Sequence, residues 1–359
     1  MIVKSLKINN LRNLSTVDIA LHPRLNFFVG DNGAGKTSVL ESLVVLAKGR
    51  SFRSGQVDAL VGPEGDAFRV VTQTSTGPGH EQTLGLERSG RSWSARHNRE
   101  DVAQLSDLAA HLPLVLIEPN SHLLVSGPPE GRRRFMDWGV FHVEHGHLLQ
   151  WRRYGRTLKQ RNAALRQRSA AVVTSLDPVL AELGERIHEQ RQAQCAALFE
   201  GVGETLGMLS PGLTAVELEY QQGWSGESLA ESLGAALERD MERGGTGAGP
   251  HRGDIAISRD GVPARETLSR GEQKAMATAL LLTQAKIMAN AGKTPLLLMD
   301  DLASEFDPAH LSRVLEFGRA LGAQVWVTGT GLDPYRALAL DDASVFHVEH
   351  GQLSEKTSD

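Results

Sequence analysis

Eight consecutive residues have the spacing G-x-x-x-x-G-K-[ST]: Gly30, Asp31, Asn32, Gly33, Ala34, Gly35, Lys36 and Thr37. Glycines in such a loop let backbone N–H groups turn inward and surround phosphate oxygens. We expect Lys36 to reach the β- and γ-phosphates and the Thr37 hydroxyl to bind Mg²⁺. An apolar run at residues 25–29 precedes the loop and a helical pattern at residues 39–46 follows it. This strand, loop, helix order favours a nucleotide site over a plain glycine turn.

Two carboxylates follow the apolar run Leu296–Met299. A carboxylate at the carboxyl end of a buried strand can hold Mg²⁺ beside bound phosphates. We expect Asp300 to do this, and Asp301 to accept a hydrogen bond from the attacking water. Alone, the pattern is also typical of a strand that meets a polar turn. Together with the phosphate loop it indicates the acidic half of the same site.

A serine precedes a helix predicted to run from residue 270 to about residue 290. Ser269 and Glu272 have the spacing of a capping box, so a well-capped helix is one interpretation. The free N–H groups at this helix start, near Gly271, and the Ser269 hydroxyl would also suit a γ-phosphate. The position about 30 residues before Asp300 favours that second interpretation.

The 359 residues are enough for two domains, or for one large domain with an insertion. We expect residues 1–125 and 245–359 to form the two parts of an α/β head, and residues 126–244 a helical arm. Patterns typical of strands occur at residues 2–8, 25–29, 296–299, 324–328 and 345–348. The glycine-rich stretch 244–250 marks the second join.

Apolar residues recur every seven positions in the predicted arm: Trp151, Leu158, Leu165, Val172 and Val179. The partner stripe of such a heptad is weak here, which favours helices that pack or pair over a long free coiled coil. Asp177 and Pro178 resemble an N-cap followed by proline at the first helical position, so they predict a helix start.

Composition excludes several classes of protein. The single cysteine, Cys195, excludes a disulfide framework and suits a reducing cytosol. No run of 18 apolar residues occurs, so we expect no membrane span and a cytoplasmic protein. The start alternates and carries lysines, unlike a signal peptide. His142, His145 and His147 lack an accompanying carboxylate or thiol cluster, so we expect no metal there.

The net charge of −5 hides a strongly basic segment. Residues 131–168 contain ten Lys or Arg against two acids, a charge of +8. Such a patch attracts nucleic-acid phosphates even on an acidic protein, because salt screens the distant charges. The candidate DNA contacts are Arg132, Arg133, Arg152, Arg156 and Lys159. A solvated helix face, or pairing with acids elsewhere in a dimer, is the alternative.

Several segments together resemble the ATP-binding-cassette ATPase heads of the DNA-repair branch that includes the SMC proteins. The segments that carry this resemblance span essentially the whole chain: residues 10–13, 30–37, 49–53, 132–138, 151–154, 249–252, 268–274 and 300–307. The resemblance implies a P-loop ATPase head of α/β class with an inserted, mainly helical arm.

In that family ATP lies between two heads, so the resemblance implies an ATP-dependent homodimer. Arg12 matches an arginine near the nucleotide, and Ser304–Asp307 matches a loop that crosses the dimer interface. The resemblance further implies a role in repair and replication restart at gapped, partly single-stranded and partly double-stranded DNA. There the protein would help RecO and RecR load RecA.

Three departures from transporter-type cassettes favour a slow switch over a motor. Asp301 replaces their glutamate, and Thr328 starts the segment where they carry a switch histidine. Glu118 stands where their lobe-linking glutamine is expected. We therefore expect a weak, DNA-stimulated ATPase. His251 and Arg252 follow the glycine-rich join, a setting unusual for a core strand, without an assigned role.

Other functions remain open at this stage. A transporter ATP-binding subunit fits the phosphate loop but not the missing switch histidine or the basic arm. An SMC-like structural head predicts a longer coiled coil than residues 148–200 can form. A metabolic phosphotransferase would have no use for Ser269 or a dimer. ATP turnover stimulated by DNA distinguishes a transporter subunit from a repair ATPase.

Overall fold

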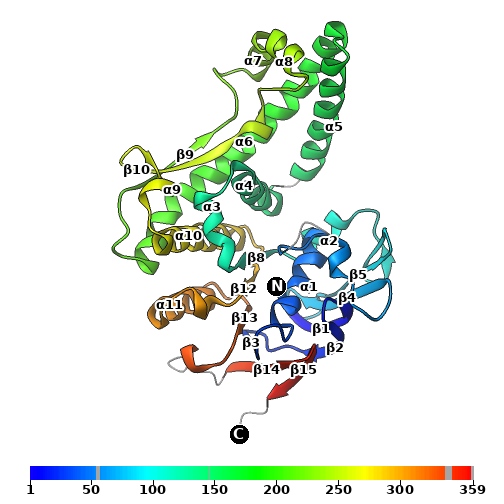
Figure 1. The fold of residues 1–359 in the computed structure, drawn as a ribbon, viewed down its shortest axis with the longest axis vertical. Helices are drawn as coiled ribbons and strands as arrows, with labels where there is room; N and C mark the ends of the chain where they lie inside the picture. The colour runs from blue at the N-terminus through cyan, green and yellow to red at the C-terminus, as the bar shows by residue number, and fades with distance from the viewer. Residues whose placement is uncertain (54–56, 145, 336–341, 357–359) are drawn as a thin grey trace. The chain divides into compact units, whose positions relative to one another are not determined.

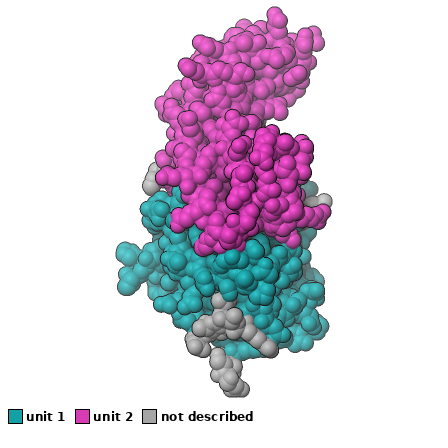
Figure 2. Space-filling view, turned by 90° about the vertical axis from the view of Figure 1, so that its left-hand side faces the viewer, with its two compact units in different colours: residues 1–121, 281–359 teal, residues 122–280 magenta. Residues whose placement is uncertain are grey.

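The computed structural model describes residues 1–53, 57–144, 146–335 and 342–356 (Figure 1). The chain divides into two compact units: unit 1 comprises residues 1–121 and 281–359, and unit 2 residues 122–280 (Figure 2). These bounds differ from the predicted division at residues 125 and 244. Residues 245–280 belong to unit 2 because β10 pairs with β9 there, which ties the segment after the join to the arm.

A mainly parallel sheet forms the centre of unit 1. Its strands lie in the order β15 (Gln352–Lys356), β14 (Ala343–Glu349), β3 (Leu25–Val29), β13 (Val325–Gly329), β12 (Leu296–Met299) and β8 (Leu114–Ile117) (Figure 1). All neighbours are parallel except β15, which forms an antiparallel hairpin with β14. The four strands predicted at residues 25–29, 296–299, 324–328 and 345–348 are confirmed, within two residues at each end.

Continuous apolar runs explain why these strands are central. Both faces of a parallel sheet are covered, so its strands need no polar alternation. Phe28 on β3 stacks on Phe346 of β14 and contacts Trp326 of β13, and all three side chains are buried. This aromatic cluster packs β3, which leads into the phosphate loop, against its two neighbours β14 and β13.

An antiparallel sheet completes unit 1. Its order is β2 (Leu14–Ala20), β1 (Ile2–Leu11), β4 (Ala67–Ser75), β5 (Glu81–Ser89), β6 (Ser92–His97) and β7 (Glu100–Asp101). Strand β1 shows the predicted alternation: Leu6 and Ile8 are buried, whereas Lys7 between them is exposed.

Three α-helices and three 3₁₀ turns lie wholly within unit 1 of the described chain. They are α1 (Lys36–Lys48), α2 (Leu105–His111), α11 (Pro308–Ala320) and the short 3₁₀ turns η1 (Val57–Leu60), η4 (Leu302–Ser304) and η5 (Asp333–Tyr335). Helix α1 ends at Gly49, which adopts a left-handed conformation. Helix α11 begins with Pro308, and the Asp307 carboxylate accepts hydrogen bonds from the Ala309 and His310 amides. The turn η2 (Pro119–His122) and the helix α10 (Arg270–Asn290) run from one unit into the other.

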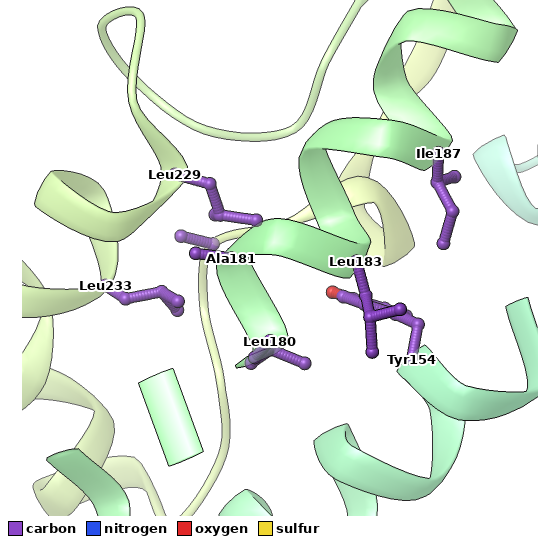
Figure 3. Close-up of a cluster of buried hydrophobic side chains, with 8 residues drawn as sticks. Tyr154, Leu180, Ala181, Leu183, Ile187, Leu229 and Leu233 are labelled. Atoms are coloured by element: carbon purple, nitrogen blue, oxygen red, sulfur yellow. The ribbon is translucent and has the colours of Figure 1, made fainter. Parts of the chain in front are cut away.

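Unit 2 is mainly helical. It contains α3 (Leu123–Ser126), α4 (Pro129–Val143), α5 (His147–Arg166), α6 (Ala170–Leu209), α7 (Leu229–Ala235), α8 (Leu237–Arg243), η3 (Pro250–Arg252) and α9 (Ala264–Thr267). A three-stranded sheet accompanies them, in the order β11 (Val262–Pro263), β10 (Asp254–Arg259) and β9 (Val216–Gln221). Helices α5 and α6 lie side by side (Figure 1). A buried cluster joins them to α7 through residues such as Tyr154, Leu183 and Leu229 (Figure 3).

Two predictions about the arm are wrong in detail. The heptad stripe stops at Leu165, because the turn at residues 167–169 ends α5; Val172 and Val179 on α6 are exposed. Pro178 lies inside α6 and does not start a helix. Asp177 accepts a hydrogen bond from the Arg161 Nε and is not a cap. None of the helices in the described residues combines the length and apolar character that a membrane span needs.

Candidate nucleotide-binding site

The carboxyl ends of four parallel strands bring the predicted site residues to one edge of the sheet. The phosphate loop follows β3, Asp300 follows β12, and Glu118 follows β8. The Asp300 N–H donates to the Ile117 carbonyl, 2.9 Å away, and the Gly30 N–H to the Gly329 carbonyl at the end of β13, 3.3 Å away. This edge is where open α/β sheets bind their ligands.

The glycines of the phosphate loop are required by its geometry. Gly33 and Gly35 have φ values of 82° and 121°, which L side chains rarely adopt. A Cβ on Gly30 would lie 2.0 Å from the Val348 carbonyl oxygen on the neighbouring strand β14. The loop therefore needs glycine both for its turn and for its close packing on the sheet.

Lys36 is the first residue of α1, and its side chain turns back onto the phosphate loop. Its ammonium donates to the Gly30 carbonyl at 2.7 Å and to the Asp31 carbonyl at 2.8 Å. Burial lowers the pKa of Lys36, while Asp301, Asp300 and Asp31 oppose that shift. The loop carbonyls thus hold the Lys36 ammonium at the position where a bound phosphate chain would meet it.

Asp300 joins the loop to the acidic strand end. Its Oδ1 accepts hydrogen bonds from the Thr37 Oγ1 at 2.9 Å and from the Thr328 Oγ1 at 2.7 Å. Burial raises the pKa of Asp300, and the two hydroxyl hydrogen bonds oppose the shift. A buried carboxylate whose hydrogen-bond donors are neutral hydroxyls is well suited to a divalent cation, which prefers oxygen ligands.

Asp301 has a left-handed backbone, with φ 50° and ψ 38°. Its N–H donates to the Thr328 Oγ1 at 2.9 Å, and its carbonyl accepts from the Ser304 Oγ at 2.8 Å. Thr328 therefore holds both carboxylate-bearing residues. In the sequence, Thr328 stood out only because a histidine is missing there. Its structural role could not be predicted, because its hydrogen-bond partners Asp301 and Asp300 lie 27 and 28 positions away.

Glu118 lies at the same edge of the sheet. Burial, and next the nearby Asp300 carboxylate, raise the pKa of Glu118 to about 7; Lys48 opposes the shift. Lys48 is itself affected, since burial lowers its pKa to about 8. The position predicted for a lobe-linking glutamine thus carries an acid that titrates near neutral pH.

Arg12 is held by a residue that the sequence did not single out. The guanidinium Nε and Nη2 donate to the two carboxylate oxygens of Glu41 at 2.9 and 2.8 Å. Glu41 is fully buried on α1, and Ser51 donates to the same carboxylate. The available sequence signal was a glutamate at position 41 within the apolar stretch that forms α1. A carboxylate buried there needs a charged partner.

Ser269 and Gly271 lie in unit 2, and both are exposed. The predicted capping box is present: the Ser269 N–H donates to the Glu272 Oε2 at 2.8 Å, and the Glu272 N–H to the Ser269 Oγ at 3.3 Å. The hydrogen bond from Arg259 is the largest of the causes that lower the pKa of Glu272. A role of Ser269 toward phosphate stays a prediction.

Known proteins identify the family. The family of the RecF/RecN/SMC N terminal domain matches residues 2–336. The chain belongs to this family. It is 43% identical to the DNA replication and repair protein RecF of Stenotrophomonas maltophilia, over 98% of this chain and 99% of the relative. It is 36% identical to the protein of the same name from Edwardsiella ictaluri, over 99% and 100%.

Solved structures show the same fold. A structure of the recombination mediator protein RecF-ATP in the RecFOR pathway matches with a TM-score of 0.88 and 23% identity, over 99% of this chain and 98% of that one. An SMC head bound to the C-winged helix domain of ScpA matches with a TM-score of 0.61 and 15% identity, over 100% and 98%. The predicted resemblance and the ATPase-head fold are therefore confirmed.

The five candidate DNA contacts differ in their exposure and in their partners. Arg132 forms a two-pronged ion pair with Asp254, at 2.7 and 2.8 Å, and Arg133 donates to the Gly253 carbonyl at 3.1 Å. Arg156 and Lys159 are exposed on α5, whereas Arg152 is half-buried. The exposed pair on α5 is the part of the predicted DNA surface that faces solvent.

His251 and Arg252 form hydrogen bonds within the glycine-rich segment that follows α8. The Tyr154 hydroxyl lies 2.6 Å from the His251 Nδ1, and the His251 Nε2 lies 3.1 Å from the Thr246 carbonyl. Because a carbonyl can only accept, Nε2 carries the proton and Nδ1 accepts from Tyr154. Burial lowers the pKa of His251 to about 4. Arg252 also donates to Thr246, so both residues fasten the 245–253 segment.

Proposed function

We propose that this protein is an ATP-dependent DNA-binding protein of recombinational repair and replication restart. The observation that carries the proposal is the assembly of Lys36, Thr37 and Asp300 at one sheet edge. The relatives named for DNA replication and repair, and the related structure named for its ATP, support the same assignment.

The residues present fit Mg²⁺ as well as ATP. Thr37 and Asp300 offer hydroxyl and carboxylate oxygens from two different elements, and Mg²⁺ bound to nucleotide takes few protein ligands of this kind. When bound, Mg²⁺ neutralises charge on the phosphate oxygens. Lys36 would turn from the Gly30 and Asp31 carbonyls to donate to the β- and γ-phosphates.

Asp301 would orient the attacking water. Its carboxylate follows directly after Asp300, and the hydrogen bonds to Thr328 and Ser304 hold its left-handed backbone. An aspartate reaches one methylene less far than the glutamate of transporter-type cassettes. Slow hydrolysis, which suits a switch, is the expected consequence.

A second copy of the chain would complete the site. Ser269 and Gly271 are exposed at the start of α10, where Ser269 is already oriented by its capping box. Free N–H groups at a helix N-terminus favour an anion. We infer that this helix start meets the γ-phosphate held by the partner, so that ATP joins two heads. We further propose that DNA stimulates turnover by the dimer.

DNA would bind along α5 of the arm. Arg156 and Lys159 are exposed there, and three positions along a helix place them on one face. Arg152 extends the same face one turn earlier, while Arg132 and Arg133 shape the base of the arm through their hydrogen bonds. The dimer would clamp DNA at single-strand gaps in the cytoplasm, where it would help RecO and RecR load RecA.

Sedimentation tests this function directly. The protein would be centrifuged alone, with ATP and Mg²⁺, and then with a gapped duplex and a fully paired duplex of equal length. We expect ATP to produce a dimer that travels with the gapped DNA. The Lys36→Met variant, at the same protein concentration, is the matched control and should stay monomeric. A wild-type monomer in saturating ATP would overturn the proposal.

The fold similarity to an SMC head supports a second function, a structural head whose arm holds a protein partner. The arm favours the first function, since its long helices span only 20 and 40 residues. Turnover separates the two: a repair ATPase should hydrolyse ATP faster when gapped DNA is added, and a structural head should not.

A further inference from the structure

The turn between β14 and β15 lies against the phosphate loop. The turn residues His350 and Gly351 have φ values of 48° and 78°, as expected for a tight two-residue hairpin turn. The Gly351 N–H donates to the Ala34 carbonyl, 3.0 Å away. The last hairpin of the described chain thus contacts the backbone of residues that would surround phosphate.

A second donor reaches the loop from the turn between β1 and β2. The Asn13 Nδ2 donates to the Gly33 carbonyl at 2.9 Å, and its Oδ1 accepts from the Ser38 Oγ at 3.2 Å. One side chain therefore connects the loop to the first turns of α1. Two consecutive loop carbonyls, those of residues 33 and 34, are held by donors from outside the loop.

These two hydrogen bonds fix the peptide planes on either side of Ala34: the Ala34 N–H donates to the Asp31 carbonyl at 3.2 Å, and the Gly35 N–H lies opposite the held Ala34 carbonyl. In a planar trans peptide the C=O and the following N–H point in opposite directions. Because Gly351 holds the Ala34 carbonyl, the Gly35 N–H must point away from the hairpin. Phosphate binding requires inward N–H groups, and an unheld loop would lose conformational entropy when it orders around phosphate.

The three segments pack backbone against backbone. A Cβ on residue 351 would lie 1.8 Å from the Asn13 carbonyl oxygen, and a Cβ on residue 30 would lie 2.0 Å from the Val348 carbonyl oxygen. Both clashes are with backbone, which cannot rotate away. Glycine at position 351 therefore lets the hairpin touch both the β1–β2 turn and the loop.

We propose that Asn13 and the Gly351 turn are positioning elements that hold the phosphate loop in its nucleotide-binding conformation before nucleotide arrives. The inference rests on the proposed ATP site. It adds a regulatory consequence: any partner that pulls on the β14–β15 hairpin would weaken nucleotide binding without touching Lys36, Thr37 or Asp300.

The Gly351→Ala variant tests the proposal. Its Cβ should push the hairpin from the loop, so that the Kd for ATP and for ADP rises about tenfold, as expected for one or two lost hydrogen bonds. The kcat at saturating ATP should change less than about twofold, since the catalytic residues are untouched. The matched control is Gly292→Ala: Gly292 has φ 80° and nothing within 4 Å of its Cβ position, so it tests backbone strain alone.

The Asn13→Ala variant provides a second test that introduces no clash. It should raise both Kd values about fivefold. If wild-type protein binds no ATP, the proposed function fails. If wild type binds ATP and Asn13→Ala binds it equally well, the positioning role is overturned. The positioning role is also overturned if Gly351→Ala folds and binds ATP as tightly as Gly292→Ala. It is overturned as well if either Gly351→Ala or Asn13→Ala lowers kcat while KM stays constant.

Discussion

The Thr37 Oγ1 donates a hydrogen bond to the Asp300 Oδ1 over 2.9 Å, although 263 positions separate the two residues. The hydroxyl and the carboxylate expected beside Mg²⁺ therefore lie within hydrogen-bond distance of each other in the folded chain. An ion that binds both groups competes with this hydrogen bond and, at the Asp300 Oδ1, also with the one from the Thr328 Oγ1. Because folding brings both ligands together, ion binding loses little additional conformational entropy in ordering them.

Lys36→Met should weaken ATP binding about 100-fold or more, because the backbone cradle loses the cationic contact that Lys36 supplies. Equilibrium dialysis with labelled ATP measures the loss. The control is Lys7→Met, since Lys7 is exposed and pairs with Asp18. Binding of wild-type strength by Lys36→Met would remove the phosphate-loop assignment.

Asp301→Asn should keep ATP bound, slow hydrolysis about 100-fold and trap the dimer, since the amide is a poor acceptor for the water proton. Single-turnover hydrolysis and sedimentation give both readings. Asparagine tolerates the left-handed backbone at φ 50°, and Asp260→Asn, with φ 53°, controls for the substitution. Unchanged turnover would mean that another group orients the water.

Ser269→Arg distinguishes a cap from a composite site. As a cap alone, Ser269 should cost about 1 kcal/mol of stability when replaced, with ATP chemistry intact. If it meets the γ-phosphate across a dimer, ATP binding by the monomer should survive while dimerisation and hydrolysis disappear together. The cap control is Ser228→Arg, since Ser228 caps α7.

Mixing Ser269→Arg with Lys36→Met chains extends this test. A mixed dimer has one composite site with both defects and one with neither, so turnover should return in part. Hydrolysis by Ser269→Arg alone at the normal rate contradicts the shared site while leaving ATP binding standing.

Charge reversal at Arg156 and Lys159 should weaken DNA binding and lower the slope of log Kd against log salt by about one per lost phosphate contact. Titrations of a gapped duplex at several salt concentrations provide the slope. Arg186→Glu on α6 is the control, because Arg186 is exposed and pairs with Glu182. A constant slope would place the DNA site elsewhere than on α5.

The stability of the protein should fall in acid through His251. Its pKa is about 4 when folded against an ordinary 6.5, so the unfolded chain binds the proton first. Neutral His251 therefore contributes stability that is full above pH 6.5 and is lost as the pH falls toward 4, by about 3 kcal/mol. Urea unfolding from pH 4 to 7 checks this. His251→Gln should be less stable at pH 7 but lose less stability in that window.

Local patterns predicted the parts of the site that lie next to each other in sequence. The phosphate loop, the run before Asp300 and the capping box of Ser269 each depend on spacings of a few residues. Thr328 and Glu41 were missed for the opposite reason. Each acts through a partner 28 or 29 positions away, and only folding brings those partners together.

One hexapeptide separates what sequence decides from what tertiary structure decides. Phe-His-Val-Glu-His-Gly occurs at residues 141–146 and at residues 346–351. In the first copy the described residues 141–143 end helix α4; in the second, residues 346–349 belong to strand β14. The same side chains carry no fixed preference, since propensity differences are small beside tertiary packing.

By itself, the sequence determined the phosphate loop, because backbone strain permits only glycine at φ values such as 121°, and the apolar strands, because burial on both faces demands them. Tertiary structure alone decided which residues surround the loop. Gly351 reaches Ala34 because β14 pairs with β3, and Thr328 reaches Asp300 because β13 pairs with β12. Strand pairing joins distant segments, and no local pattern encodes that choice of neighbours.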